Sequence, residues 1–198
     1  MTKCAFTIVD DSHYYPEGTH IFVNSFKYFH PNIDLVVFRQ NTIDKVFAEK
    51  GINFFQAKPT FAKLLTNDYE LVVNIDADHV ITAYMDEVFD QDYDVGGPWN
   101  YNDYENASFE NIEETMYVQA GMVASRKPEF WDIWEKANVN AMNYLRKEND
   151  TMNLVWYNDP IVSKMNRVIW DKDKKVYLGC KSLGREALFK IGNEGELY

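Results

Sequence analysis

The sequence predicts an α/β fold in which helices flank a mostly parallel central sheet. In its first half, short apolar runs alternate with amphipathic stretches of helical period, and polar loops follow the apolar runs. Alternation of this kind is typical of parallel strands joined by crossover helices. Such sheets place their ligands beyond the carboxyl ends of the strands. The expected strands are 4–9, 35–38, 52–55 and 71–75, and the expected helices between them are 17–29, 41–50 and 60–66.

Several of these elements have a boundary signal of their own. Pro31 breaks the first helix, Gly51 is a stop signal for the second, and Thr60 can cap the third. The run 71–75 is the most apolar of the strands and stops at Asp76. We therefore expect it to be the central strand of the sheet.

The second half of the chain is less regular, and no linker or domain boundary is visible in it. Gly121 interrupts an expected strand, Pro128 begins a long amphipathic helix, and Asp159 before Pro160 is expected to open another helix. Two short apolar runs around a charged turn are expected to pair as a hairpin. In chain order these elements are a helix at 85–89, a strand at 116–124, helices from 128 to about 146 and from 159, and hairpin strands at 168–170 and 175–178.

Composition limits the classes of partner. The chain has 198 residues, with 31 Asp and Glu against 20 Lys and Arg, so its formal net charge is -11. This charge argues against a nucleic-acid polymer or an anionic membrane as partner, because both need a basic face. No apolar run approaches the ~20 residues that span a bilayer, and no signal-peptide pattern is visible. We therefore expect a cytoplasmic protein with reduced thiols at Cys4 and Cys180.

Paired carboxylates in the sequence suggest a cation site. There are four Asp-x-Asp triplets, so the spacing alone does not identify a site. The triplet 171–173 alternates with lysines in the expected turn, and the run 90–94 lacks the Gly and Glu of a calcium loop. Asp76 and Asp78 instead end the most apolar strand, where residues two apart point the same way. The pair predicts a site for a hard divalent cation that bridges to phosphates.

Four segments together carry a resemblance to a known family. Residues 74–81 (NIDADHVI) resemble the DxD segment of GT-A-fold glycosyltransferases. Residues 6–11 (FTIVDD), followed by Tyr14, Tyr15 and Pro16, resemble the nucleotide-binding first strand and loop of glycosyltransferase family 8. Residues 117–123 (YVQAGMV) resemble the "YfNaGvm" strand of that family, with Gln119 in place of the usual Asn. Asn158 and Asp159 stand where the family shows an acidic "DQ" pair that opens a helix.

The resemblance implies a GT-A fold and a metal-dependent glycosyltransferase. The chain is then one domain, residues 1–198, with a nucleotide-binding half over about 1–80 and a sugar and acceptor half over about 81–198. The expected donor is a nucleoside-diphosphate sugar, a UDP-sugar in the first place, and the expected acceptor is a glycan or glycoprotein. Asp76 and Asp78 would hold the metal, Mn²⁺ or Mg²⁺, with Asp76 also near the ribose.

The resemblance also implies roles for individual residues. Asp10 or Asp11 would accept hydrogen bonds from ribose or base, Tyr14 or Tyr15 would stack on the base, and Gly97 would let a sugar approach the backbone. Lys63 would be the cation near the sugar phosphate. Gln119 would bind sugar hydroxyls or the glycosidic oxygen, and Asp159 would be the acidic residue nearest the anomeric carbon. The full set of expected donor-binding residues is Val9, Asp10, Asp11, Tyr14, Tyr15, Lys63, Asp76, Ala77, Asp78 and Gly97.

Departures from the family pattern leave alternatives open. Family 8 enzymes usually supply a metal-binding His near the C-terminus, whereas the four histidines here are His13, His20, His30 and His79. A module that binds a sugar nucleotide without turnover is therefore one alternative. A sugar-nucleotide pyrophosphorylase is another, although it would want a Gly-rich loop after the first strand. The resemblance favours retention at the anomeric carbon, and inversion would need a base from the loop, either Asp103 or Glu105.

Overall fold

The computed structural model describes residues 2–9, 15–99, 117–170 and 177–179. Its main sheet has six strands in the order β2-β1-β3-β6-β5-β7. β1 is parallel to β2 and β3, β6 runs antiparallel to both β3 and β5, and β7 is parallel to β5. The expected mostly parallel α/β sheet is thus confirmed. The strands are β1 (Lys3–Val9), β2 (Asp34–Arg39), β3 (Leu71–Ile75), β5 (Val95–Pro98), β6 (Met122–Ser125) and β7 (Arg167–Trp170).

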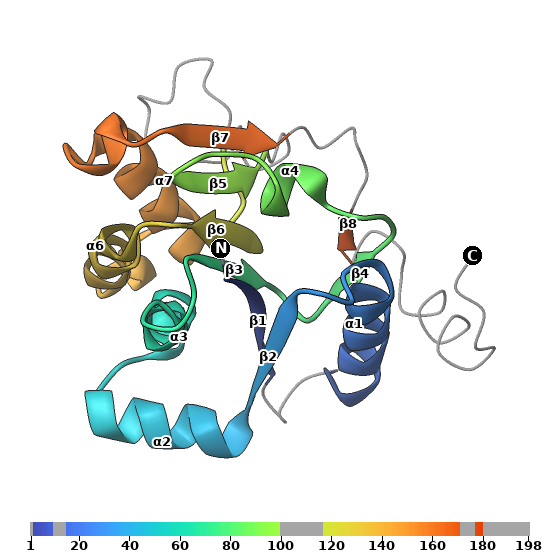
Figure 1. The fold of residues 1–198 in the computed structure, drawn as a ribbon. Coiled ribbons are helices and arrows are strands. Elements are labelled where there is room, and N and C mark those ends of the chain that lie inside the picture. The colour runs from blue at the N-terminus through green and yellow to red at the C-terminus, as the bar shows by residue number, and fades with distance from the viewer. Residues whose placement is uncertain (1, 10–14, 100–116, 171–176, 180–198) are drawn as a thin grey trace.

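Helices cover the two faces of this sheet, as Figure 1 shows. One apolar core lies between the sheet and α2, α3, α6 and α7, and a second lies between the sheet and α1 and α4. Adjacent β1 residues serve the two cores, Ala5 facing one and Phe6 the other, as the alternation of a strand requires. Within the described ranges, no helix is both long and apolar enough to cross a membrane. The α-helices are α1 (Tyr15–Phe29), α2 (Gln40–Lys50), α3 (Ala57–Leu65), α4 (Asp86–Phe89), α6 (Pro128–Asn138) and α7 (Glu148–Asn158).

Two short strands form a separate sheet beside the main one. β4 (His79–Ile81) follows β3 after the turn at residues 76–78 and pairs antiparallel with β8 (Tyr177–Gly179). The expected hairpin between 168–170 and 175–178 is therefore wrong, because β8 pairs with β4 and β7 pairs with β5. This pairing brings a segment from the end of the chain alongside the residues that follow Asp78 (Figure 1).

Local signals explain some helix boundaries and correct others. α2 ends at Gly51, which has φ of 63° and donates its N–H to the Phe47 carbonyl at 2.9 Å, as expected of a glycine stop signal. The strand expected at 52–55 is instead a turn that leads into η1 (Phe54–Gln56). The Asn53 side chain causes this turn by accepting hydrogen bonds from the N–H groups of Phe55 and Gln56, at 3.0 and 3.3 Å.

Three further helix limits differ from the expectation. α3 begins at Ala57, so Thr60 is inside the helix and its hydroxyl donates to Glu135. α6 ends at Asn138 and is followed by η2 (Ala141–Asn143), so it does not reach residue 146. No helix opens at Asp159: α7 ends just before it, and its carboxylate caps the 3₁₀ turn η3 (Val162–Lys164).

Candidate functional site

Asp76 and Asp78 lie at the carboxyl end of β3, where parallel sheets bind their ligands. All five residues of β3 are buried, whereas the Asp76 and Asp78 side chains are 35% and 26% exposed. The Asp76 N–H donates to the Gly121 carbonyl at 2.8 Å, which ties the turn to the segment before β6. Ala77 is buried between the two carboxylates. The sequence placed this pair correctly at the mouth of the sheet.

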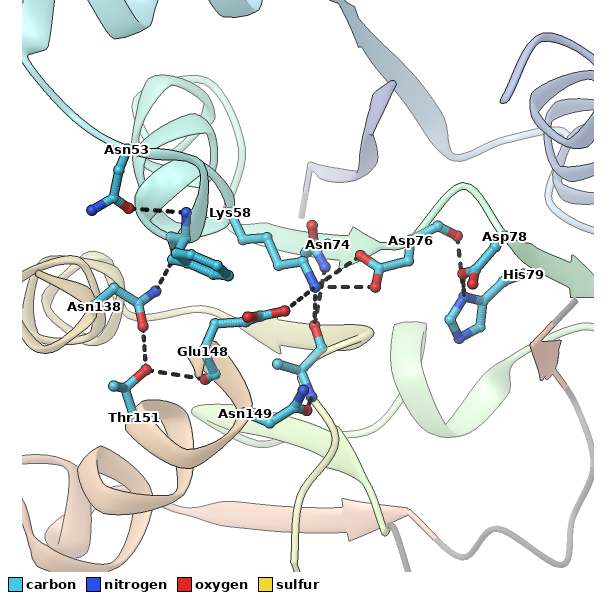
Figure 2. A network of polar contacts seen from close by, with 12 residues as sticks. Asn53, Lys58, Asn74, Asp76, Asp78, His79, Asn138, Glu148, Asn149 and Thr151 are labelled. Carbon is cyan, nitrogen blue, oxygen red and sulfur yellow. Dashed lines mark hydrogen bonds and ion pairs between the residues drawn. The ribbon is translucent and has the colours of Figure 1, made fainter. Parts of the chain in front are cut away.

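The cation beside this pair is Lys58, in the first turn of α3. Its Nζ lies 3.0 Å from both carboxylate oxygens of Asp76 and 3.1 Å from the Ala120 carbonyl. A second carboxylate, that of Glu148 at the start of α7, lies 3.9 Å from the same Nζ. Figure 2 shows the Lys58 chain reaching between Asp76 and Glu148. Lys58 thus joins three elements that are far apart in the sequence.

These carboxylates keep Lys58 charged although its side chain is only 16% exposed. Burial lowers its pKa, but Asp76, Glu148 and Asp78 together raise the pKa by more, so the net shift is upward. Lys58 is therefore an ammonium ion at neutral pH. In a chain with an excess of acidic residues, it supplies local positive charge at the end of β3.

Gly121 leaves room for three polar side chains to converge. A Cβ at this position would lie 3.2 Å from His79 Cε1, 3.4 Å from Asp76 Oδ2 and 3.5 Å from Gln119 Cδ. Gln119 therefore faces the same space as Asp76, and its contact with a sugar stays a prediction. His79 is buried, and its Nδ1 lies 3.1 Å from the Asp76 carbonyl oxygen and 3.3 Å from Asp78 Oδ1.

The acidic residue that opens a helix beside this site is Glu148, which corrects the expectation for Asp159. Glu148 begins α7 next to Lys58, and Asp159 follows the last residue of the same helix. α7 has 11 residues, so at 1.5 Å per residue its ends lie roughly 15 Å apart. Asp159 Oδ1 is also occupied, because it accepts hydrogen bonds from the N–H groups of Ile161 and Val162, at 2.8 and 3.1 Å.

Lys63 and Gly97, both expected to contact the donor, have partners within the protein. Lys63 Nζ lies 2.7 Å from Asp132 and 2.6 Å from Glu135 on α6, so it joins α3 to α6. The basic position beside Asp76 belongs to Lys58 on the same helix. A Cβ at Gly97 would collide with Val118, so close packing explains this glycine, and its contact with a sugar stays a prediction.

The remaining expected residues belong to β1 and the loop after it. Val9 is the last residue of β1 and is buried in register with Arg39. The roles expected of Asp10, Asp11 and Tyr14, of the Tyr15 side chain, and of the bases Asp103 and Glu105 lie outside the described residues.

Sequence analysis missed Lys58 and Glu148, although each carried a signal. Pro59 directly follows Lys58, and proline is common in the first turn of a helix. This places Lys58 at the start of α3, near the strand ends. Glu148 and Asp150 form an acidic first turn for α7, which is typical of helix N-termini.

The carboxylate oxygens at the end of β3 suit a cation whose remaining ligands come from a bound substrate. Among the described residues, no three His, Cys, Asp or Glu side chains are grouped so as to hold a metal ion. Mg²⁺-type sites commonly use one or two carboxylates, with phosphate oxygens and water completing the shell. Asp76 and Asp78 provide such a pair, with part of each carboxylate exposed. The residues present therefore fit a nucleotide-bridging cation.

Comparisons with known proteins identify the fold. No protein-family model matches the sequence, and no curated protein matches it. Among solved structures, the galactosyltransferase LgtC in complex with donor and acceptor sugar analogues superposes with a TM-score of 0.58 at 12% identity, over 96% of this chain and 95% of LgtC. An apo structure of the bifunctional glycosyltransferase WbbM gives a TM-score of 0.55 at 15% identity, over 85% of this chain. This chain covers 38% of the WbbM chain. The chain has the GT-A fold of these glycosyltransferases.

Proposed function

We propose that this protein is a metal-dependent glycosyltransferase that moves a sugar from a nucleoside-diphosphate sugar, with UDP as the expected nucleotide, to a glycan or glycoprotein. The observation that carries the proposal is the grouping of Asp76, Asp78 and Lys58 at the carboxyl end of β3. A GT-A fold supports it, and the LgtC structure of this fold holds donor and acceptor sugar analogues.

In this proposal, Asp76 and Asp78 hold Mn²⁺ or Mg²⁺ at the diphosphate. When bound, the cation offsets the negative charge of the diphosphate and of the leaving nucleotide. Lys58 adds a fixed positive charge to the same region, and Asp76 and Glu148 hold it in place. A protein with a net charge of -11 needs such local cations to bind an anionic donor.

Gln119 is the proposed contact for the donor sugar. Its side chain lies beside Asp76 and His79 around Gly121, so an amide is available next to the expected diphosphate. Retention is the proposed stereochemistry: the acceptor oxygen replaces the diphosphate on the same face of the anomeric carbon, and its proton leaves with the diphosphate. This route needs no separate carboxylate base. Glu148 is the other carboxylate beside Lys58. It forms an ion pair with Lys58 and is not assigned the role of a base.

Turnover of a panel of UDP-sugars in the presence of Mn²⁺ tests the proposed function. We expect slow release of UDP with water as acceptor, faster release with a suitable glycan, and an NMR spectrum of the product that keeps the donor configuration. A protein that binds the donor but neither hydrolyses nor transfers it would be a sugar-nucleotide-binding module. Release of pyrophosphate from a nucleoside triphosphate and sugar phosphate would indicate a nucleotidyltransferase. A product of opposite configuration would exclude retention.

A further inference from the structure

Two asparagines of α7 hold the Gln119 segment by its backbone. Asn153 Oδ1 accepts the Val118 N–H at 2.9 Å, and Asn153 Nδ2 donates to the Val118 carbonyl at 2.8 Å. One helical turn earlier, Asn149 Oδ1 accepts the Ala120 N–H at 2.8 Å. We call Asn149 and Asn153 the amide clamp. The clamp side chains take the place of a neighbouring strand. They form hydrogen bonds with the backbone N–H and carbonyl groups that would otherwise pair with such a strand.

The same segment is also held from its other sides. The Gln119 N–H donates to the Pro98 carbonyl at 2.9 Å. Lys58 Nζ donates to the Ala120 carbonyl at 3.1 Å, and Figure 2 shows Lys58, Asn74 and Asn149 meeting around this point. The backbone on both sides of Gln119 is thus fixed, and its side chain faces the space above Gly121.

Asn153 is suited to this task by its chemistry and its burial. A primary amide is neutral and offers a donor and an acceptor side by side, so it can pair with both polar groups of one residue. The Nδ2 of Asn153 also donates to the Asn149 carbonyl at 2.8 Å, which links the two clamp residues. Asn153 is fully buried, so it does not itself reach a substrate.

We infer that Asn153 is a positioning residue for sugar transfer that acts through Gln119. It holds Val118 against α7 and thereby sets where the Gln119 amide meets the donor sugar. The inference rests on the proposed function and deepens it, because it names a buried residue on which the geometry of the site depends. Displacement of a reacting group by about 1 Å can slow catalysis by about 100-fold.

A double-mutant cycle between Asn153 and Gln119 tests the inference. Asn153→Leu should lower kcat about tenfold or more while the KM for the donor stays within about threefold, because positioning affects the transition state most. In a Gln119→Ala background the same change should have little further effect on kcat, because the group being positioned is absent. If the loss of kcat in the double variant equals the product of the losses in the two single variants, the inference is overturned.

Asn138→Leu is the matched control for loss of a buried amide. Asn138 is also fully buried, on α6; it donates to the Phe55 carbonyl at 2.7 Å and accepts the Thr151 hydroxyl, so its hydrogen bonds go to residues other than 118–120. We expect it to lower the melting temperature about as much as Asn153→Leu, since each leaves buried backbone groups without a partner, but to keep kcat within about twofold. An equal loss of kcat in both variants would reduce Asn153 to a residue needed only for stability.

Amide hydrogen exchange tests the clamp without any turnover. In Asn153→Leu, the Val118 N–H should exchange about tenfold or more faster than in the wild-type protein, while the amides of β1 keep their rates. Unchanged exchange at Val118 would overturn the clamp whether or not the protein transfers sugar. If the wild-type protein turned over no donor while Val118 exchange rose as expected, the proposed function and the positioning role would both fail, and only the structural clamp would stand.

Discussion

Two basic side chains, Lys58 in α3 and His30 just after α1, have opposite surroundings. Lys58 lies among the carboxylates of Asp76, Glu148 and Asp78, and its pKa is raised. His30, just after α1, is 1% exposed and lies against aromatic rings, including Phe26 at 4.8 Å and Tyr84 at 4.9 Å between ring centroids. Burial lowers the pKa of His30 to about 4, although the Phe26 carbonyl and Asp90 act to raise it.

The difference separates a site from a packed core. His30 is neutral at physiological pH, and its Nε2 accepts the Met85 N–H at 2.9 Å, which ties α1 to the segment before α4. Lys58 keeps its charge because carboxylates surround it. A cluster of charged groups at the open end of a parallel sheet is a candidate ligand site. Changes around Lys58 should therefore alter donor turnover, and changes around His30 should alter stability alone.

Removal of one carboxylate at the end of β3 should have the largest effect on donor turnover. We expect Asp78→Ala to lower Mn²⁺-dependent kcat/KM by about 100-fold or more, because a cation ligand is lost. Asp92→Ala is the matched control, since it removes an exposed carboxylate of another Asp-x-Asp triplet and should leave kcat/KM unchanged. Steady-state kinetics over a range of Mn²⁺ concentrations measures both. Equal losses in the two variants would place the cation elsewhere.

Replacement of Lys58 should have the next largest effect. Lys58→Met leaves Asp76 and Glu148 without their shared cation, so we expect kcat/KM for the donor to fall about tenfold. The free energy of unfolding should also fall, by about 2 kcal/mol, because one partner of a largely buried ion pair is gone. Kinetics and urea unfolding measure the two effects.

Lys63→Met distinguishes the structure from the sequence-based expectation. Lys63 is on the same helix but pairs with Asp132 and Glu135, so kcat/KM should stay within about twofold of the wild-type value and the unfolding free energy should change by less than about 1 kcal/mol. A larger loss of kcat/KM in Lys63→Met than in Lys58→Met would restore Lys63 as the cation at the donor.

Elements with local signals could be predicted from the sequence, and contacts between distant segments could not. β1 and β3 are continuous apolar runs, and the end of α2 is marked by Gly51. Nothing local indicates that β6 runs antiparallel between β3 and β5, or that β8 pairs with β4. These pairings are decided by packing across the whole chain.

The candidate site divides in the same way. Asp76 and Asp78 directly follow a continuous apolar strand, so their place at the end of β3 follows from local pattern, although both lie in the turn between β3 and β4 and not on the strand itself. Lys58 and Lys63 are five positions apart on a helix and so point about 140° apart, and the sequence did not tell which one faces β3. The clamp of Asn149 and Asn153 depends on contacts 29 and 35 residues away along the chain. Such contacts leave no pattern in either segment alone.

Gly121→Ala should lower kcat/KM less than Lys58→Met does, and its effect should be confined to the site. The new Cβ would press on His79 Cε1 at 3.2 Å and on Asp76 Oδ2 at 3.4 Å, so we expect a loss of about three- to tenfold in kcat/KM from displaced groups. Gly96→Ala is a control in the core, because its Cβ would collide with Trp170 and should cost about 1–3 kcal/mol of stability by overpacking. A Gly121→Ala enzyme with unchanged kcat/KM would place the donor away from Gly121.

His30→Gln should have the smallest effect on turnover, within about twofold at pH 7, because His30 lies in the core. It should instead change how stability depends on pH. The pKa of His30 is about 4 in the folded protein and ~6.5 when unfolded. The contribution of neutral His30 to the free energy of unfolding is therefore complete above pH ~6.5 and is lost as pH falls toward 4. The loss is about 3 kcal/mol in total.

The difference between wild type and His30→Gln isolates this effect from the titration of carboxylates. Gln keeps an acceptor for the Met85 N–H but does not titrate. The difference in unfolding free energy, measured with urea at several pH values, should therefore shrink or change sign between pH 6.5 and 4. Curves that stay parallel over this range would mean that His30 protonates equally well in the folded protein.

Calorimetric titration of the wild-type protein with UDP, with and without Mn²⁺, tests most directly whether Asp76 and Asp78 form a nucleotide-bridging cation site. We expect binding that depends on Mn²⁺, with an affinity lower by about tenfold or more when the ion is chelated, because the cation joins the carboxylates to the diphosphate. Equally tight binding of UDP with and without Mn²⁺, or no binding in either condition, would contradict the account.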